Sequence, residues 1–176
     1  MEKEELPGDA STLIYLAKAD AFRDAARCLE AILVAPAVWR EAVEDAERLG
    51  YPDVPHIRQA AEDGFVRCVE LTGEEQALAG WVATEHRLGV GESEALALGR
   101  GAGRALLDDG RATRVAPTLG VEPVSTLFLP ALGCLHGSLD RSAAVAFLRR
   151  LAIVTGARAE AIYEIEAFIH EVPNED

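Results

Sequence analysis

Cysteine and histidine are scarce in this sequence, and their spacing excludes two common kinds of stabilising site. The three cysteines are odd in number and lie far apart, at Cys28, Cys68 and Cys134. The four histidines are equally scattered, at His56, His86, His136 and His170. Neither a disulfide framework nor zinc-ligand spacing is present. We therefore expect any metal site in this protein to be built from oxygen ligands.

Long apolar runs are also lacking, although 49% of the 176 residues are hydrophobic. No stretch approaches the length that a membrane-spanning helix needs, and the first residues, MEKEELPGD, contain no apolar signal-peptide core. We expect a cytoplasmic protein that does not enter membranes. A chain of this length buries a proper core, and the length favours a single domain.

Positive charge is the third scarce feature, because 17 lysines and arginines face 30 acidic residues and leave a net charge of −13. This balance excludes a broadly basic surface of the kind that usually binds nucleic acid. A local basic region remains open, since arginines concentrate in the second half at Arg100, Arg104, Arg111, Arg114, Arg149 and Arg150. For any one of them, a solvated helix face is the simpler interpretation.

Alternating helical and apolar segments predict an α/β fold, with a parallel sheet covered by helices on both faces. We expect strands at residues 31–35, 65–69, 105–107 and 123–127. We expect helices at residues 11–18, 22–29, 37–50, 74–88, 92–98, 111–119, 142–154 and 157–171. Trp81 is expected on the buried side of its helix.

Acidic residues recur where predicted strands meet the helices that follow them. The carboxyl ends of parallel strands share one edge of a sheet, and ligands collect there. The acidic residues near this edge are Asp9, Glu41, Glu92, Glu94, Asp108 and Asp109. Because Mg²⁺ and Mn²⁺ prefer carboxylate and water oxygens, their recurrence predicts a divalent-ion site.

Each acidic residue also has a simpler structural interpretation. Asp9 is a good helix N-cap, and Glu92 and Glu94 would gain from the dipole of the helix that they begin. Glu41 would be one solvated charge among several, and the segment 108–110 would be a turn. The joint recurrence favours a site over these separate explanations.

Four segments resemble successive blocks of PIN-like domains. They are DASTLIYLAKAD, APAVWREAVE, LGVGESEALALG and ALLDDGRATRVAPTLGVEPVSTLFLPALGCLHG. The closest resemblance is to a bacterial and archaeal subgroup of toxin-type PIN nucleases with a GE-x-EA helix start and an L-x-DD strand end. The resemblance implies a three-layer α/β/α fold with a central, mainly parallel sheet. We expect a PIN-like domain over residues 1–137, with C-terminal helices over 138–176 packed on the same domain.

The resemblance also implies a Mg²⁺- or Mn²⁺-dependent endoribonuclease, often the toxin of a toxin–antitoxin pair. The catalytic residues that it implies are Asp9, Ser11, Glu41, Glu92 and Asp109. The metal ligands that it implies are Asp9, Glu92 with Glu94 as an alternative, and Asp109 with Asp108 beside it. Bound ions would activate a water molecule and stabilise charge on the phosphate, while Arg111 and Arg114 would touch RNA phosphates.

Two features depart from the PIN pattern. The residues ahead of Asp9 are polar and include Pro7 and Gly8, which a central strand disfavours, so the first strand is either shortened or replaced by another arrangement. The acidic residue at the later helix start is Glu where PIN nucleases commonly have Asp.

An inactive PIN-like interaction module is therefore kept as an alternative to the nuclease. A cognate antitoxin protein and a second copy of the chain are the protein partners considered. The stripe Ile162, Ile165 and Ile169 would serve core packing or self-association.

Overall fold

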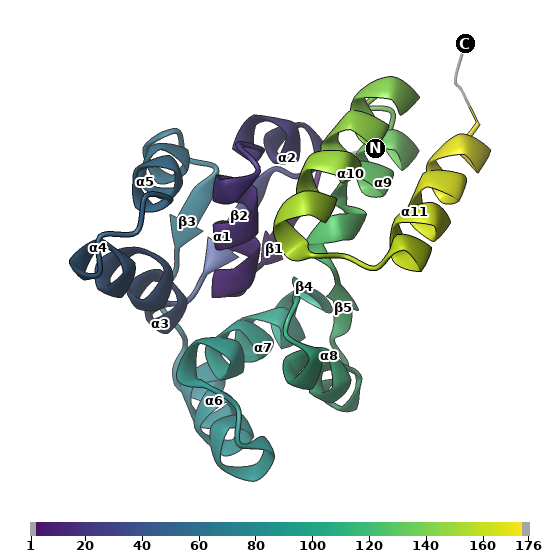
Figure 1. The fold of residues 1–176 in the computed structure, drawn as a ribbon. Helices are drawn as coiled ribbons and strands as arrows, with labels where there is room; N and C mark the ends of the chain where they lie inside the picture. Colours follow the sequence, from purple (N-terminus) through teal and green to yellow (C-terminus); the bar gives the residue numbers. More distant parts are fainter. Residues whose placement is uncertain (1–2, 174–176) are drawn as a thin grey trace.

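Short parallel strands form a continuous sheet through the middle of the protein (Figure 1). The structure is a computed structural model that describes residues 3–173. The strands are β1 (Glu5–Pro7), β2 (Ala31–Val34), β3 (Val66–Cys68), β4 (Arg104–Leu106) and β5 (Glu122–Val124). β2 pairs with both β1 and β3, β4 pairs with β5, and a parallel bridge between Gly8 and Leu106 joins the two groups. The spatial order is therefore β3-β2-β1-β4-β5.

Helical segments make every connection between successive strands, and the chain continues after β5 as helices. The connecting helices are α1 (Ala10–Lys18), α2 (Phe22–Cys28), α3 (Pro36–Trp39), α4 (Ala46–Arg48), α5 (Val54–Glu62), α6 (Gly73–His86), α7 (Val90–Ala102) and α8 (Gly110–Val115). The helices that follow β5 are α9 (Leu129–Leu135), α10 (Arg141–Thr155) and α11 (Ala159–Glu171). A π-helix, η1 (Arg40–Asp45), separates α3 from α4, and two 3-10 helices, η2 (Ala116–Leu119) and η3 (Thr126–Phe128), flank β5.

The helices cover the sheet in layers. α1 lies in front of the sheet in Figure 1, where it packs against α5 and α10, while α7 packs on β1 and β4. The predicted three-layer α/β/α fold with a parallel sheet is confirmed. No helix among residues 3–173 is long and apolar enough to cross a membrane.

Two arrangements were expected for the first strand, and the structure has the shortened strand, because β1 contains only three residues. Gly8 N donates to Leu33 O of β2, whereas Asp9 N donates to Leu106 O of β4. Because successive N–H groups alternate between the two neighbouring strands, the missing N–H of Pro7 faces β4. This proline therefore explains why a single bridge, and not a longer ladder, joins β1 to β4.

An ion-pair cluster at the amino ends of the strands supports the same junction. Arg104 at the start of β4 contacts Glu4 with Nη1 at 2.6 Å and Glu122 with Nε at 3.1 Å. Three strands are thus held together where the hydrogen-bonded ladder is incomplete.

Trp81 was expected to pack in the core and the isoleucine stripe of α11 to pack there or to self-associate, and of the two only the stripe packs against the core. The expectation that Trp81 faces the core was wrong, because its side chain is 50% exposed on α6. Ile169 is fully buried, and Ile162 and Ile165 pack partly against the core, so the core-packing interpretation of this stripe is the one observed. The division into residues 1–137 and 138–176 stays a prediction.

We predict that Gly8→Ala destabilises the fold by roughly 1–3 kcal/mol, the usual cost of overpacking a core. A Cβ at this position would lie 2.8 Å from Cγ2 of the buried Ile32. Gly80→Ala is the control, because nothing lies within 4 Å of a Cβ built there, in the middle of α6. Urea unfolding should show a loss for the first variant and no loss for the second. Equal stabilities would contradict the close packing of β1 on β2.

Candidate functional site

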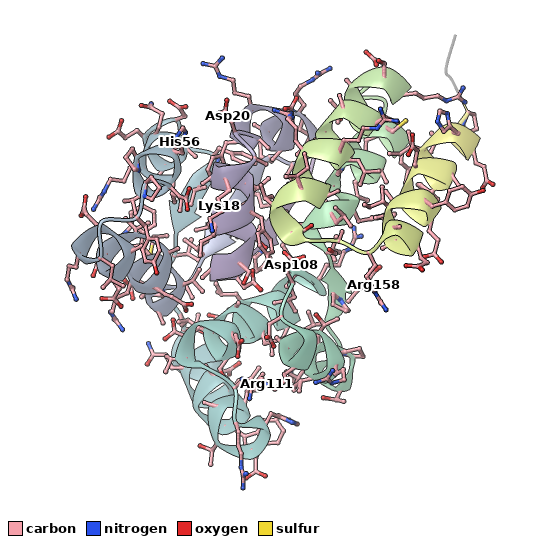
Figure 2. The ribbon with its side chains drawn as sticks, viewed as in Figure 1. Lys18, Asp20, His56, Asp108, Arg111 and Arg158 are labelled. Carbon is pink, nitrogen blue, oxygen red and sulfur yellow. The ribbon has the colours of Figure 1, made fainter. Side chains whose placement is uncertain are left out.

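Asp9 and Asp108 lie together where the strand order changes direction. Asp9 directly follows the bridge at Gly8, and Asp108 follows β4 by two residues. The backbone N–H of Asp108 donates to Asp9 Oδ2 at 3.1 Å, which brings the two acidic residues side by side. Figure 2 shows Asp108 near the centre of the protein. Ligand sites of open parallel sheets form at this kind of switch point.

Asp9 is buried, with 3% of its surface exposed, and it also caps α1. Its Oδ1 accepts hydrogen bonds from Thr12 N at 2.8 Å and from Thr12 Oγ1 at 2.9 Å. The capping interpretation of Asp9 is therefore correct for Oδ1. Its other oxygen, Oδ2, faces Asp108.

Asp108 is surrounded by hydroxyl groups. Its Oδ1 accepts from Ser125 Oγ at 2.9 Å and from Thr126 N at 3.1 Å. Its Oδ2 accepts from Thr126 Oγ1 and, at 3.4 Å, from Thr12 Oγ1. Thr12 and Thr126 are fully buried, and their hydroxyl oxygens lie 3.0 Å apart. The two carboxylates and these hydroxyls form one connected network at the sheet edge.

The environment of the pair raises the pKa of Asp9 to about 6. Burial is the main cause, and the negative charge of Asp108 adds to it, while the hydrogen bonds from Thr12 and Asp108 act in the opposite direction. The pKa of the Tyr15 phenol is also raised, first by burial and then by the charges of Asp108 and Asp9. Tyr15 lies one turn after Thr12 on α1, so the negative charges of the pair disfavour ionisation of its phenol.

Asp109 has a different role from its neighbour. Its Oδ1 accepts from Arg111 N at 2.7 Å and from Ala112 N at 3.0 Å, which caps the start of α8. Within residues 3–173, no hydrogen bond joins Asp109 to Asp9. The structure thus brings Asp108, and not Asp109, into contact with the first acidic residue.

Two of the predicted glutamates, Glu92 and Glu94, lie in the first half of α7, and the third, Glu41, lies on η1. Glu92 Oε2 accepts from Gly89 N at 2.9 Å, which closes the first turn of that helix. Glu41 lies close to it on η1, since the pKa of Glu41 is raised by burial and then by the charges of Glu92 and Asp45. A Cβ at Gly91 would lie only 3.0 Å from Glu41 Oε2, so the Glu41 carboxylate packs closely against the first turn of α7.

Glu94 is turned toward the end of β2. Its Oε2 accepts from Ala37 N at 2.8 Å, within the first turn of α3, which follows that strand. Glu94 therefore belongs to the same edge of the sheet as Asp9 and Asp108, although its carboxylate already has a protein partner.

Among residues 3–173, no three histidine, cysteine, aspartate or glutamate side chains converge closely enough to hold a metal ion on their own. Two carboxylates are close neighbours, at Asp9 and Asp108, where Thr12 Oγ1 contacts an oxygen of each. Mg²⁺ commonly keeps several waters and is bound through one or two carboxylates together with substrate phosphates. The paired oxygens and their mutual repulsion fit such an ion, because a cation would neutralise the like charges.

Ser11 lies on α1 and the predicted RNA-binding arginines lie on α8, the helices that follow Asp9 and Asp108 in the chain. Ser11 is half-buried in the first turn of α1, immediately before Thr12. Arg111 Nη1 donates to Arg87 O at 3.3 Å, and Arg114 Nη1 lies 3.8 Å from a Cβ built at Gly110. Both guanidinium groups are thus close to the first turn of α8.

Sequence reasoning missed the hydroxyls that surround Asp108. Ser125 and Thr126 were expected inside a strand at 123–127, but β5 ends at Val124 and η3 begins at Thr126. A Ser-Thr pair after an apolar strand is a typical start of a helical turn, and this signal was available. Thr12 could have been found as the third residue after the Asp9 cap.

We predict that Asp108→Asn alters how stability depends on pH in the presence of a chelator. The folded-state pKa of Asp9, about 6, is above its ordinary value of 3.8, so the folded state retains a proton that the unfolded state loses. The free energy of unfolding should therefore fall as pH rises between these values and then level off. Removing the charge at 108 should make this fall shallower, by about 1.4 kcal/mol for each unit by which the pKa of Asp9 drops.

Urea unfolding across this pH range measures the effect, and Asp109→Asn is the matched control because its carboxylate caps α8. Asparagine suits both positions, since it caps helices well and the hydroxyls around Asp108 can accept as well as donate. Parallel pH curves for Asp108→Asn and the unaltered protein would rule out electrostatic coupling within the pair.

A protein-family model described as a PIN domain matches residues 8–160. No curated protein and no solved structure matches the chain. The match begins beside Asp9 and includes the Asp9–Asp108 pair, the glutamates of α7 and the arginines of α8. PIN domains are a nuclease-type family whose members generally depend on divalent metal ions. Because this family model matches most of the chain, the chain belongs to the PIN-domain family.

Proposed function

We propose that the protein is a Mg²⁺- or Mn²⁺-dependent endoribonuclease whose site is centred on Asp9 and Asp108. The observation that carries the proposal is the pairing of these carboxylates at the switch point of the sheet, with the Asp108 N–H on Asp9 Oδ2. Two like charges so close are costly unless a proton or a cation neutralises them. Membership of the PIN family makes a divalent cation the better explanation.

The chain's own residues would divide the work at such a site. Asp9 and Asp108 would hold the ion, and Thr12 and Thr126 keep both carboxylates in fixed orientations. When bound, the ion supplies an activated water and stabilises the charge that develops on the phosphate.

The remaining predicted residues would act around this pair. Glu41, Glu92 and Glu94 would add negative charge at the start of α7, where further coordinated water can be oriented. Ser11 would hydrogen-bond a water or a phosphate oxygen from the first turn of α1. Asp109, named by the family resemblance, would position α8 through its cap.

Arg111 and Arg114 would hold the RNA backbone beside the carboxylates. Both are exposed near the first turn of α8, and α8 directly follows the acidic pair. They supply the local positive charge that an RNA needs to approach a chain with a net charge of −13. The family resemblance adds the role of a toxin, held inactive by a cognate antitoxin in the cytoplasm.

One observation favours a second candidate, an inactive interaction module. Asp108 already accepts hydrogen bonds from Ser125, from Thr126 through N and Oγ1, and from Thr12. These donors satisfy its oxygens without any cation. A module of this kind would bind a protein partner or a second copy of itself, and its binding would be indifferent to Asp108→Asn.

The proposal predicts that Mn²⁺ binding and RNA cleavage both depend on Asp108. Calorimetry of Asp108→Asn should show Mn²⁺ affinity lower by roughly tenfold or more, the usual scale for disturbing a metal site. The same variant should lose Mn²⁺-dependent cleavage of single-stranded RNA, and a chelator should stop cleavage by the unaltered protein. Asp109→Asn is the control, with both properties retained.

Two results would decide against the nuclease. One is the absence of metal-dependent cleavage across several RNAs, together with tight binding of a co-encoded small protein that Asp108→Asn does not weaken. The other is Mn²⁺ affinity and RNA cleavage that Asp108→Asn leaves unchanged, which would rule out a nuclease site centred on Asp108.

We also predict that replacing Arg111 and Arg114 by alanine weakens RNA binding most at low salt. Each lost phosphate contact should reduce the slope of log affinity against log salt by about 0.7 for single-stranded RNA. Anisotropy of a labelled oligonucleotide across a salt series measures the slope. Arg23→Ala is the control, because Arg23 is exposed on α2, which lies at the opposite end of the protein from α8 (Figure 1). An unchanged slope in the double variant would remove these arginines from the RNA path.

A further inference from the structure

Trp81 is a large aromatic side chain that folding does not bury. It lies on α6 with 50% of its surface exposed, and Val90 at the start of α7 is 62% exposed. The indole ring packs edge-on against His86, with ring centroids 5.4 Å apart and an interplanar angle of 82°. The ring is therefore held in place while half of its surface stays open to solvent.

Exposed arginines follow this end of α6 and lie on α8, which contacts it through Arg111. Arg87, Arg111 and Arg114 are exposed, and none of them forms a salt bridge within residues 3–173. Arg111 donates to the carbonyl of Arg87, the residue after His86, and so joins α8 to the end of α6.

The same corner is connected to the candidate site along the chain. Arg111 is three residues after Asp108, and the turn at Arg87–Gly89 leads directly to Glu92. Figure 2 shows Arg111 between α6 and α8. A single strand of RNA bound across Arg87 and Arg111 would therefore extend toward the acidic pair.

We propose that Trp81, Arg87 and Arg111 form a binding surface for one unpaired nucleotide of single-stranded RNA, with its base stacked on the Trp81 ring. The inference rests on the proposed nuclease function and adds how the substrate is held. Aromatic rings flanked by arginines bind single strands in this way, because any base can stack while the arginines hold the backbone. Bases of a duplex are already stacked on each other, so the surface selects unpaired RNA.

The chain offers a direct spectroscopic test, because Trp39 and Trp81 are its two tryptophans. In Trp39→Phe, all indole emission comes from Trp81. We combine this change with Asp108→Asn to prevent cleavage, and titrate with a short oligoadenylate at low salt. Stacking of a base should quench the emission to saturation, and a backbone-matched abasic oligonucleotide should quench it much less.

Affinity gives a second readout that does not depend on Trp39. In the Asp108→Asn background, Trp81→Ala should weaken binding of a labelled oligoadenylate by roughly tenfold, within the range seen for loss of one base–aromatic stack. Trp81→Phe should restore most of that loss. Tyr163→Ala is the matched control, because Tyr163 is a 75% exposed aromatic on α11, away from α6.

The outcomes separate this inference from the nuclease function. RNA that binds without quenching Trp81, and equally well after Trp81→Ala, would overturn the stacking surface while Mn²⁺-dependent cleavage could still be observed. Quenching without any cleavage by the unaltered protein would overturn the nuclease and keep the surface. Trp81 emission that responds to protein concentration but not to RNA would make this corner a contact between copies and would also overturn the inference.

Discussion

The close approach of two carboxylates, Asp9 and Asp108, is the constraint on which the rest of the site depends. Burial removes the water that would screen them, so each charge must be met by donors from the chain or by a cation. The hydroxyls of Thr12, Ser125 and Thr126 supply part of that compensation. The pKa of Asp9, raised to about 6, shows that this compensation is incomplete.

The local sequence around Asp9 follows from the same constraint. Asp9 has to leave β1 beside β4, and Gly8 allows this because Ile32 leaves no room for a Cβ there. Pro7 has no N–H to donate to β4, which confines the contact between the two strands to the bridge at Gly8, just before the acidic pair. Pro7 and Gly8 look unsuitable for a central strand, yet Gly8 allows the end of β1 to lie close to the neighbouring strand β4. The residues before Asp9 are polar because the first strand contains only three residues, not because that strand is missing.

Much of the fold could be predicted because its signals are local. The apolar run at 31–35 and the proline after it indicate β2 and α3, and the alternation of strands with helices indicates a parallel sheet. The helix at 54–62 was missed because Pro52 and Pro55 indicate a loop, although Pro55 lies in the first turn, where proline is tolerated. Trp81 was misplaced because its hydrophobicity was taken as burial, which periodicity alone cannot establish on a helix that is only partly covered.

The site was harder to predict because adjacent residues have different partners. The sequence places Asp108 and Asp109 at the end of β4, but only the backbone geometry turns one carboxylate toward Asp9 and the other toward the N–H groups of α8. The partners of Asp108 are distant in sequence, with Thr12 and Thr126 supplied by α1 and η3. No short motif encodes such a network.

Net charge and local charge have separate consequences in this protein. A surplus of acidic residues repels RNA over long distances, yet screening at physiological salt limits that repulsion to roughly 8 Å. Within this range, a nucleic acid responds to the side chains directly beneath it. Within the described residues, neither Arg111 nor Arg114 forms a salt bridge, so no acidic side chain cancels their positive charge locally. An acidic protein can therefore carry a carboxylate pair at the sheet edge and, on the helix that follows Asp108, arginines whose positive charge is not cancelled locally.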